Sequence, residues 1–222
     1  MSAIDTLLSE IFATRKPRFY AEFAEWLRSS RRFADFAHTY RNKIRAKLTN
    51  AKHPGSLEDL YAELQAAARL CSEQRFAVEY EHYAAAKQRG PDFTVLFKNH
   101  TLFNVEVRRV QSQSNYLEQV LAEKAKQLPA GIHNVLWLAI DGELAEGRVQ
   151  QVLNQLILHA QHKDESYFAS MGYENAGSFL KQFQRMSAVL VLGSSTLLLA
   201  NPVARHAVPN DLQSALRRLT SA

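Results

Sequence analysis

Two short motifs bring carboxylates to positions from which they could act together. Gly90-Pro91-Asp92 opens a predicted strand, and Glu106-Val107-Arg108 lies inside the next strand. Thirteen residues separate Asp92 from Glu106, so a hairpin with a short connection brings the start of one strand level with the end of the other. Two carboxylates at one end of a strand pair are hard ligands suited to Mg²⁺ or Mn²⁺, and such an ion can activate water for phosphodiester cleavage. The spacing therefore predicts a divalent-metal site on Asp92 and Glu106.

Three further charged residues could join these carboxylates. Arg108 is two residues from Glu106, so both side chains point to the same face of the strand, whereas Arg109 points to the other face. Glu63 stands at the edge of the apolar stripe of a preceding helix and could lean toward the site. Lys124 stands within the apolar stripe of a following helix. It either reaches the site or covers the core with its stem while its ammonium group stays in water.

The elements that must position these residues follow from the hydrophobic periods. Apolar residues that recur three to four positions apart indicate helices. Alternating apolar and polar residues, or short apolar runs, indicate strands. Ser56 and Ser114 are the predicted N-caps of two helices. The first three strands pair as an antiparallel meander, and the next helix crosses over to a parallel strand. The predicted order is a helix over 56–72, strands over 76–82, 92–97 and 101–110, a helix over 115–128 and a strand over 135–140.

This order of elements and the motifs within it resemble the PD-(D/E)xK nuclease superfamily. The resemblance covers about residues 56–141. It implies an α/β protein with a restriction-endonuclease-like αβββαβ core around a mixed central sheet, and Mg²⁺- or Mn²⁺-dependent cleavage of DNA. By resemblance, the metal ligands are Asp92, Glu106, the backbone carbonyl of Val107 and the helix residue Glu63.

The chain departs from that family at the lysine position, where it has Arg108. Arginine keeps the charge and can grip a phosphate with two hydrogen bonds, but its pKa is too high for it to share a proton with an attacking water. The superfamily tolerates a lysine that has moved to another element, and Lys124 is the candidate here. Two functions stay open: metal-dependent cleavage of DNA, and a nuclease-like module that binds nucleic acid or a protein partner without cutting.

The first quarter of the chain carries the whole basic excess. The formal charge is +5, and residues 1–52 alone have a net charge of +6. Helices are predicted over 5–14, 18–29 and 31–49. The last two carry an apolar stripe that is rich in aromatic residues. The break at His53-Pro54-Gly55-Ser56 suggests a basic helical appendage over 1–53 and a nuclease-like α/β domain over 54–222. The candidate nucleic-acid-binding residues are Arg31, Arg32, Arg41, Lys43, Arg45 and Lys47. The alternatives are a solvated helix face and a scaffold whose aromatic stripes dock on a partner or form a homodimer.

The rest of the chain is predicted to extend this domain. Helices over 148–162 and 174–185, a strand hairpin over 188–192 and 196–200, and a closing helix from Asn210 or Asp211 form a C-terminal α/β extension of the sheet. His159 and His162 are three apart on one helix, which favours a surface pair over a metal site because no third ligand is obvious.

Composition narrows the classes of protein. Hydrophobic residues make up 46% and charged residues 22%, which is ordinary for a globular protein. The single cysteine, Cys71, excludes an intrachain disulfide and a cysteine-rich zinc site. No apolar run approaches the roughly 18 residues of a membrane span, and the first residues do not resemble a secretory signal, so we expect a cytoplasmic protein without membrane contact.

Overall fold

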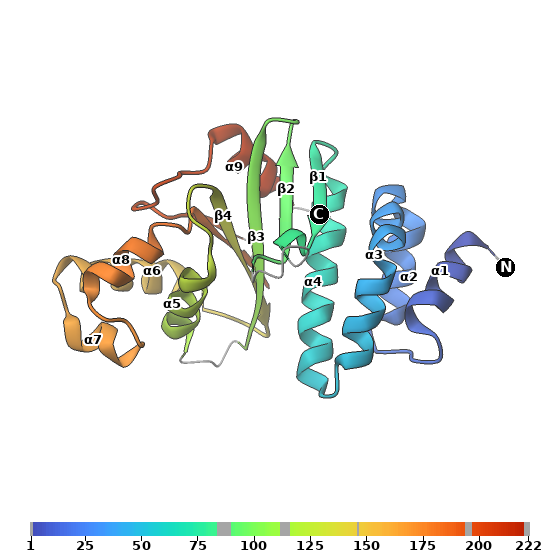
Figure 1. Ribbon diagram of the computed structural model, residues 1–222, viewed down its shortest axis with the longest axis horizontal. Helices are drawn as coiled ribbons and strands as arrows, with labels where there is room; N and C mark the ends of the chain where they lie inside the picture. Colours follow the sequence, from blue (N-terminus) through green and yellow to red (C-terminus); the bar gives the residue numbers. More distant parts are fainter. Residues whose placement is uncertain (1, 84–89, 112–115, 146, 194–196, 220–222) are drawn as a thin grey trace.

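One mixed sheet of six strands lies at the centre of the chain, and the strands are ordered in space as they are in the sequence. The computed structural model describes residues 2–83, 90–111, 116–145, 147–193 and 197–219 (Figure 1). The strands are β1 (Phe76–Tyr80), β2 (Phe93–Phe97), β3 (Thr101–Gln111), β4 (His133–Asp141), β5 (Ala188–Leu192) and β6 (Leu197–Ala200). The helices of the described ranges are α1 (Ala3–Phe12), α2 (Tyr20–Ser29), α3 (Arg31–Asn50), α4 (Pro54–Ser72), α5 (Leu117–Gln127), α6 (Arg148–Gln161), α7 (Glu165–Ser170), α8 (Ala176–Phe183) and α9 (Asn210–Arg218).

The strand directions follow from the connections. β1, β2 and β3 form an antiparallel meander, and Lys98 and Asn99 in the tight β2–β3 connection both have positive φ. β3, β4 and β5 are parallel, because helices cross over between them, and β6 returns antiparallel to β5. The predicted meander, the crossover to a parallel strand and the extension of the sheet by the late hairpin are confirmed. The chain is an α/β protein with a mixed sheet.

Helices cover both faces of the sheet (Figure 1). α4 packs on β1 and β3, with α1, α2 and α3 outside it, while α5, α6 and α8 lie on the other face. The side chains of β4 show the consequence, since Val135 and Trp137 belong to the core on the α4 side, and Leu136 and Leu138 to the core on the α5 side. The apolar run at 135–140 therefore forms a strand covered on both faces, as predicted.

The N-terminal helices share their core with the sheet. Phe23 of α2 contacts Phe33 of α3 with ring centres 5.4 Å apart, and Phe36 of α3 lies 6.3 Å from Phe93 of β2. These rings belong to one hydrophobic cluster with the buried residues of α4. The aromatic residues of these stripes are thus mainly core residues. The division of the chain at residue 53 stays a prediction, but a cut there would expose apolar surface on both sides.

Some predicted boundaries are wrong. α4 begins at Pro54 with His53 as its N-cap, three residues before the predicted cap at Ser56. Proline suits a first helical turn because its fixed φ is already helical and its missing N–H needs no partner there. β1 ends at Tyr80 because Glu81 has a φ of +50°. α7 was not expected, since six residues are too few to show a helical period. The predicted cap Ser114 lies outside the described residues.

Candidate active site

The free edge of β3 is where the predicted carboxylates meet. The pairing of β2 with β3 ends at Phe93 and Val105, so residues 106–111 of β3 run on beyond β2 and pair only with β4 in the described part of the sheet. Asp92 precedes Phe93 and Glu106 follows Val105, which puts the two acidic residues at the same level of neighbouring chains. Oδ2 of Asp92 accepts a hydrogen bond from the backbone N–H of Val107 at 2.8 Å. The spacing of thirteen residues thus sets Asp92 and Glu106 at one level of the sheet.

Lys124 reaches these carboxylates from α5. Its Nζ donates to Oε1 of Glu106, and also lies 3.2 Å from Oε1 of Gln127. The Lys124 side chain is 17% exposed and that of Glu106 is 9% exposed, so this ion pair is largely removed from water. Leu117 and Leu121, seven and three residues before Lys124, are buried on the same face of the helix. Of the two alternatives for Lys124, the structure shows the one in which the ammonium group turns inward.

A second ionic network adjoins the site from the N-terminal helices. Oε2 of Glu63 on α4 accepts hydrogen bonds from the Tyr80 hydroxyl and from Nζ of Lys47 on α3, the latter at 2.6 Å. Nζ of Lys47 also lies 2.8 Å from Oε1 of Glu81, and Lys43 lies 3.9 Å from the same carboxylate. The Glu63 carboxylate is therefore held by Lys47 of α3 and Tyr80 of β1, and its role as a metal ligand stays a prediction.

The electrostatics of the site reflect its concentrated negative charge. Burial raises the pKa of Asp92 well above its usual value, and the carboxylates of Glu63 and Glu106 raise it further. The Val107 N–H and Lys47 oppose this shift without cancelling it. Burial alone would lower the pKa of Lys47, but the attraction of Glu63 and the hydrogen bond to Glu81 outweigh burial, so this pKa is raised. The carboxylates thus lie where a cation is favoured.

The donor set fits Mg²⁺ or Mn²⁺ better than a metal that needs many protein ligands. Among the described residues, no three Asp, Glu, His or Cys side chains form a group that could hold an ion. Mg²⁺ needs only one or two carboxylates, because it retains several of its waters. Asp92 and Glu106 supply two carboxylates of this kind. Glu63 would have to leave Lys47 and Tyr80 to become a further ligand.

Arg108 and Arg109 are neighbours in β3 whose side chains point to opposite faces of the strand, and their surroundings differ. Nε of Arg109 donates a hydrogen bond to Oδ1 of Asp59 at 3.0 Å, and its Nη1 donates to the carboxylate of Asp141. Arg108 is exposed on the free edge and makes no ion pair within the described ranges. Arg108 therefore takes no part in the contact between Glu106 and Lys124, and it is accessible to a ligand.

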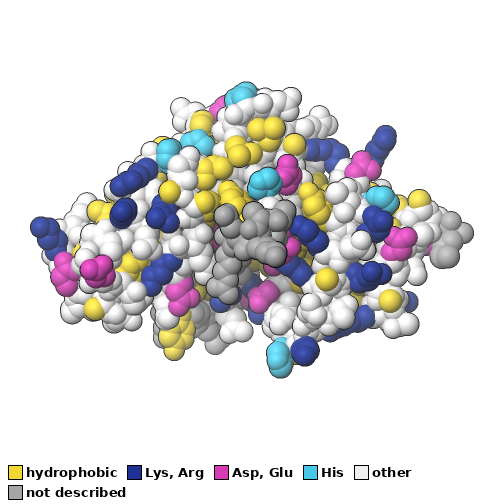
Figure 2. All heavy atoms as spheres, in the orientation of Figure 1, with side chains coloured by type: hydrophobic (Ala, Val, Ile, Leu, Met, Phe, Trp, Pro, Cys, Tyr) yellow, Lys and Arg dark blue, Asp and Glu magenta, His cyan; other side chains and the backbone are white. Residues whose placement is uncertain are grey.

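The basic residues of α3 have different surroundings. Arg32 donates to the backbone carbonyls of Cys71, Glu73 and Phe76, which ties α3 to the end of α4. Lys43 and Lys47 face the site, and Arg41 lies 3.2 Å from Glu10. Arg31 and Arg45 are exposed. On the face in Figure 2, Lys and Arg side chains lie over both halves of the molecule rather than in one patch. Binding of nucleic acid by these six residues stays a prediction.

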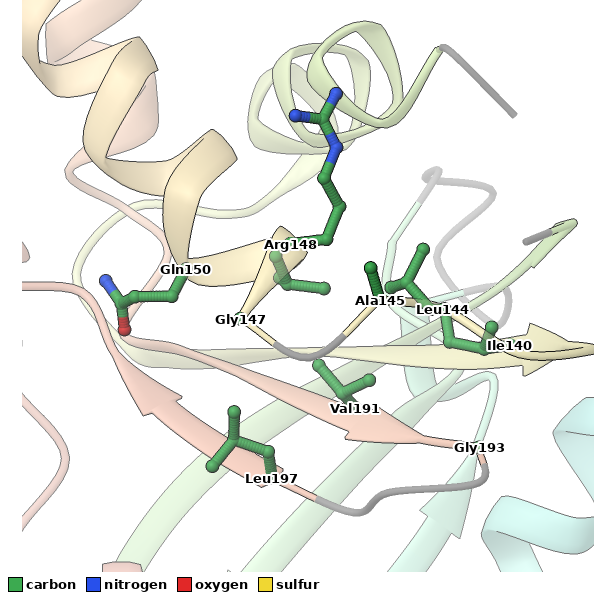
Figure 3. A pocket seen from close by; sticks show the side chains of 10 residues that line it. Ile140, Leu144, Ala145, Gly147, Arg148, Gln150, Val191, Gly193 and Leu197 are labelled. Carbon is green, nitrogen blue, oxygen red and sulfur yellow. The ribbon is translucent and has the colours of Figure 1, made fainter. Parts of the chain in front are cut away.

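Two other places can be set aside. Figure 3 shows a pocket beside β4 and β5 in which Val191 and Leu197 form apolar walls and Arg148 extends away. Its free volume is about 20 Å³, which is room for about one water molecule. His159 stacks on Tyr167 and its Nδ1 lies 2.9 Å from Asp164, so it has partners other than His162.

Tyr80 and Glu81 were not predicted as part of the site, and Lys47 was assigned to phosphate binding. The alternation along β1 predicts that the Tyr80 side chain is buried, but it does not predict which residue the Tyr80 hydroxyl binds. Comparisons of the chain with protein-family models, with curated proteins and with solved structures gave no match. No described helix is long and apolar enough to span a membrane.

Proposed function

We propose that this chain is a divalent-metal-dependent nuclease of the PD-(D/E)xK type that hydrolyses phosphodiester bonds in DNA. The observation that carries the proposal is the contact of Lys124 with Glu106, beside Asp92. The strand motif alone has arginine in the lysine position, so it lacks a group that can exchange a proton. The inward turn of Lys124 supplies that group from α5. The antiparallel meander followed by a parallel crossover strand supports a restriction-endonuclease-like core.

Each residue has a role that follows from its place. Asp92, Glu106 and the Val107 carbonyl would hold Mg²⁺ or Mn²⁺. The bound ion would supply Lewis-acid stabilisation of the phosphate charge and a lower pKa for an attacking water. Lys124 would orient that water through the N–H groups of its ammonium group. Arg108, exposed at the same edge, offsets charge on the phosphate that is attacked.

The test is cleavage of end-labelled single- and double-stranded DNA with Mg²⁺ or Mn²⁺. We expect the wild type to cut, EDTA to stop the reaction, and Glu106→Gln and Lys124→Met each to lower the rate at least about 100-fold, as loss of a positioned proton-transfer or charge-stabilising group does. Lys181→Met is the matched control, because Lys181 is exposed on α8 and should leave the rate unchanged. Absence of cleavage by the wild type with either ion refutes the proposal.

One observation favours the second candidate, a module of this shape that binds nucleic acid without cutting it. Lys124 already neutralises Glu106, and that arrangement holds the carboxylate in place without an ion. A binding module predicts DNA affinity that falls steeply with salt and does not change with Mg²⁺. Calorimetric titration of Mn²⁺ separates the candidates. The nuclease binds the ion and loses this affinity in Glu106→Gln, whereas the binding module shows no heat of binding.

A further inference from the structure

We infer that Arg108 and Tyr116 form a subsite for one unpaired nucleotide next to the catalytic carboxylates, so that the substrate is single-stranded or locally unpaired nucleic acid. The inference rests on the proposed nuclease function, and it adds the substrate class. It is carried by a groove, an exposed ring and an exposed guanidinium group that meet at the free edge of β3.

The groove lies where β3 has run beyond its pairing with β2. Its free volume is about 290 Å³, close to the lower end of the range for small-ligand sites. Asp59 and Arg109 line the side toward α4, and Arg108, Tyr116 and Val120 line the side toward α5. A space of this size accommodates one nucleotide unit but not a duplex. The groove begins within two residues of Glu106.

Tyr116 offers a flat apolar surface to this groove. Its side chain is 67% exposed, more than any other large hydrophobic side chain of the described residues. It stands at the N-cap position of α5. Stacking of a nucleic-acid base on an exposed aromatic ring is tolerant of sequence, because every base has a π face. A base stacked on Tyr116 would remove the exposed ring from water.

Arg108 supplies the matching charge. It is two residues from Glu106 on the same strand, which is about 7 Å along β3. Its neighbour Arg109 is held by Asp59 and Asp141, so the two arginines differ in availability. A guanidinium group can bind a phosphate with two parallel hydrogen bonds. A strand whose scissile phosphate lies between Glu106 and Arg108 therefore presents the base beside that phosphate to Tyr116.

The same geometry selects against an intact duplex. A base that stacks on Tyr116 must first leave its own stack and its pairing partner, and this costs least in a strand that is already single. The chain should therefore bind and cut single strands in preference to duplexes of the same sequence.

Binding is measured first, by fluorescence anisotropy of a labelled single-stranded oligonucleotide and its duplex, in EDTA so that nothing is cut. Tyr116→Ala should weaken single-strand binding about 5- to 150-fold, the range expected for loss of one stacked base. Tyr116→Phe keeps the ring and should stay within about 2-fold of the wild type, which separates stacking from any role of the hydroxyl. Leu158→Ala, at a 50% exposed position on α6, is the surface control and should have no effect.

Cleavage with Mn²⁺ then locates the base. Oligonucleotides that carry one abasic residue at successive positions should include one position at which wild-type cleavage falls to the level of Tyr116→Ala. At that position the Tyr116→Ala variant should show no additional loss, because the base that it no longer stacks is already missing. Arg108→Ala should lower cleavage of both the normal and the abasic strand.

The results separate this inference from the proposed function. Single-strand affinity that is equal in Tyr116→Ala and the wild type overturns the subsite, as does an equal loss in Tyr116→Phe. If the wild type cuts DNA and Tyr116→Ala cuts single strands as well, the nuclease stands and the subsite is refuted. If the wild type binds single strands through Tyr116 but cuts nothing, the subsite is supported and the nuclease is refuted.

Discussion

Replacing Lys124 by methionine should destabilise the protein, because it leaves the Glu106 carboxylate with no cation in contact. Glu106 is 7% exposed, and methionine fills much of the space of the lysine stem without its charge. Removal of one partner from a buried ion pair costs about 3–5 kcal/mol. The Lys124 side chain keeps some contact with water, so we expect about 3 kcal/mol, at the lower end of that range. In a chain of 222 residues this corresponds to a fall in Tm of about 6–12 °C.

The double variant Lys124→Met with Glu106→Gln tests the cause. Removing both charges leaves no uncompensated carboxylate, so the two losses should not add, and the coupling should be about 2 kcal/mol. Urea unfolding followed by the fluorescence of the two tryptophans, Trp26 and Trp137, measures the free energy of unfolding of each variant. Lys181→Met serves as the control for loss of one surface charge.

Mg²⁺ adds a second readout to the same variant. If Glu106 is a metal ligand, the lysine and the ion compete for it, and Mg²⁺ should stabilise Lys124→Met more than the wild type. An ion at about 100 times its Kd adds about 2.7 kcal/mol. The reasoning is refuted if Lys124→Met unfolds within about 0.5 kcal/mol of the wild type and shows no coupling with Glu106→Gln, since that is the behaviour of a surface lysine whose head lies in water.

Two neighbouring arginines and one tyrosine give further predictions. Arg32→Ala should cost about 3 kcal/mol in urea unfolding, because its guanidinium group satisfies three backbone carbonyls, whereas Arg31→Ala, at a side chain that is 94% exposed, should cost almost nothing. Equal losses in the two variants would contradict this assignment. Burial, followed by the charge of Glu118, raises the pKa of Tyr167 to about 12. The folded state therefore holds this proton more tightly than the unfolded state, and the stability that it contributes is complete below pH 10 and is lost as the pH rises from about 10 to 12. Unfolding at pH 9 and pH 11.5 should show a smaller alkaline loss in Tyr167→Phe than in the wild type, and parallel losses would disprove the effect.

Local patterns in the sequence were enough to predict the central elements and one part of the site. The alternation in β1 and the apolar run of β4 depend on which faces of a strand are buried, and consecutive residues carry this information. The meander followed, because short connections leave antiparallel pairing as the available geometry. The placement of Asp92 and Glu106 at one level of the sheet followed from the same register, because thirteen residues and a tight connection fix which residues lie opposite each other.

The partners of the long charged side chains were decided by packing. Lys124 could have pointed to water or to the site, and the docking of α5 on the sheet turned it toward Glu106. Lys47 belongs to the basic N-terminal segment and was a candidate for phosphate binding, but the packing of α3 on α4 placed it against Glu63. The groove at Arg108 exists because β2 begins at Phe93, level with Val105, while β3 continues to Gln111. This depends on the relative lengths of the two strands. Long side chains have many rotamers of similar energy, so contacts between elements distant in the chain select among them, and those contacts arise only when the helices pack.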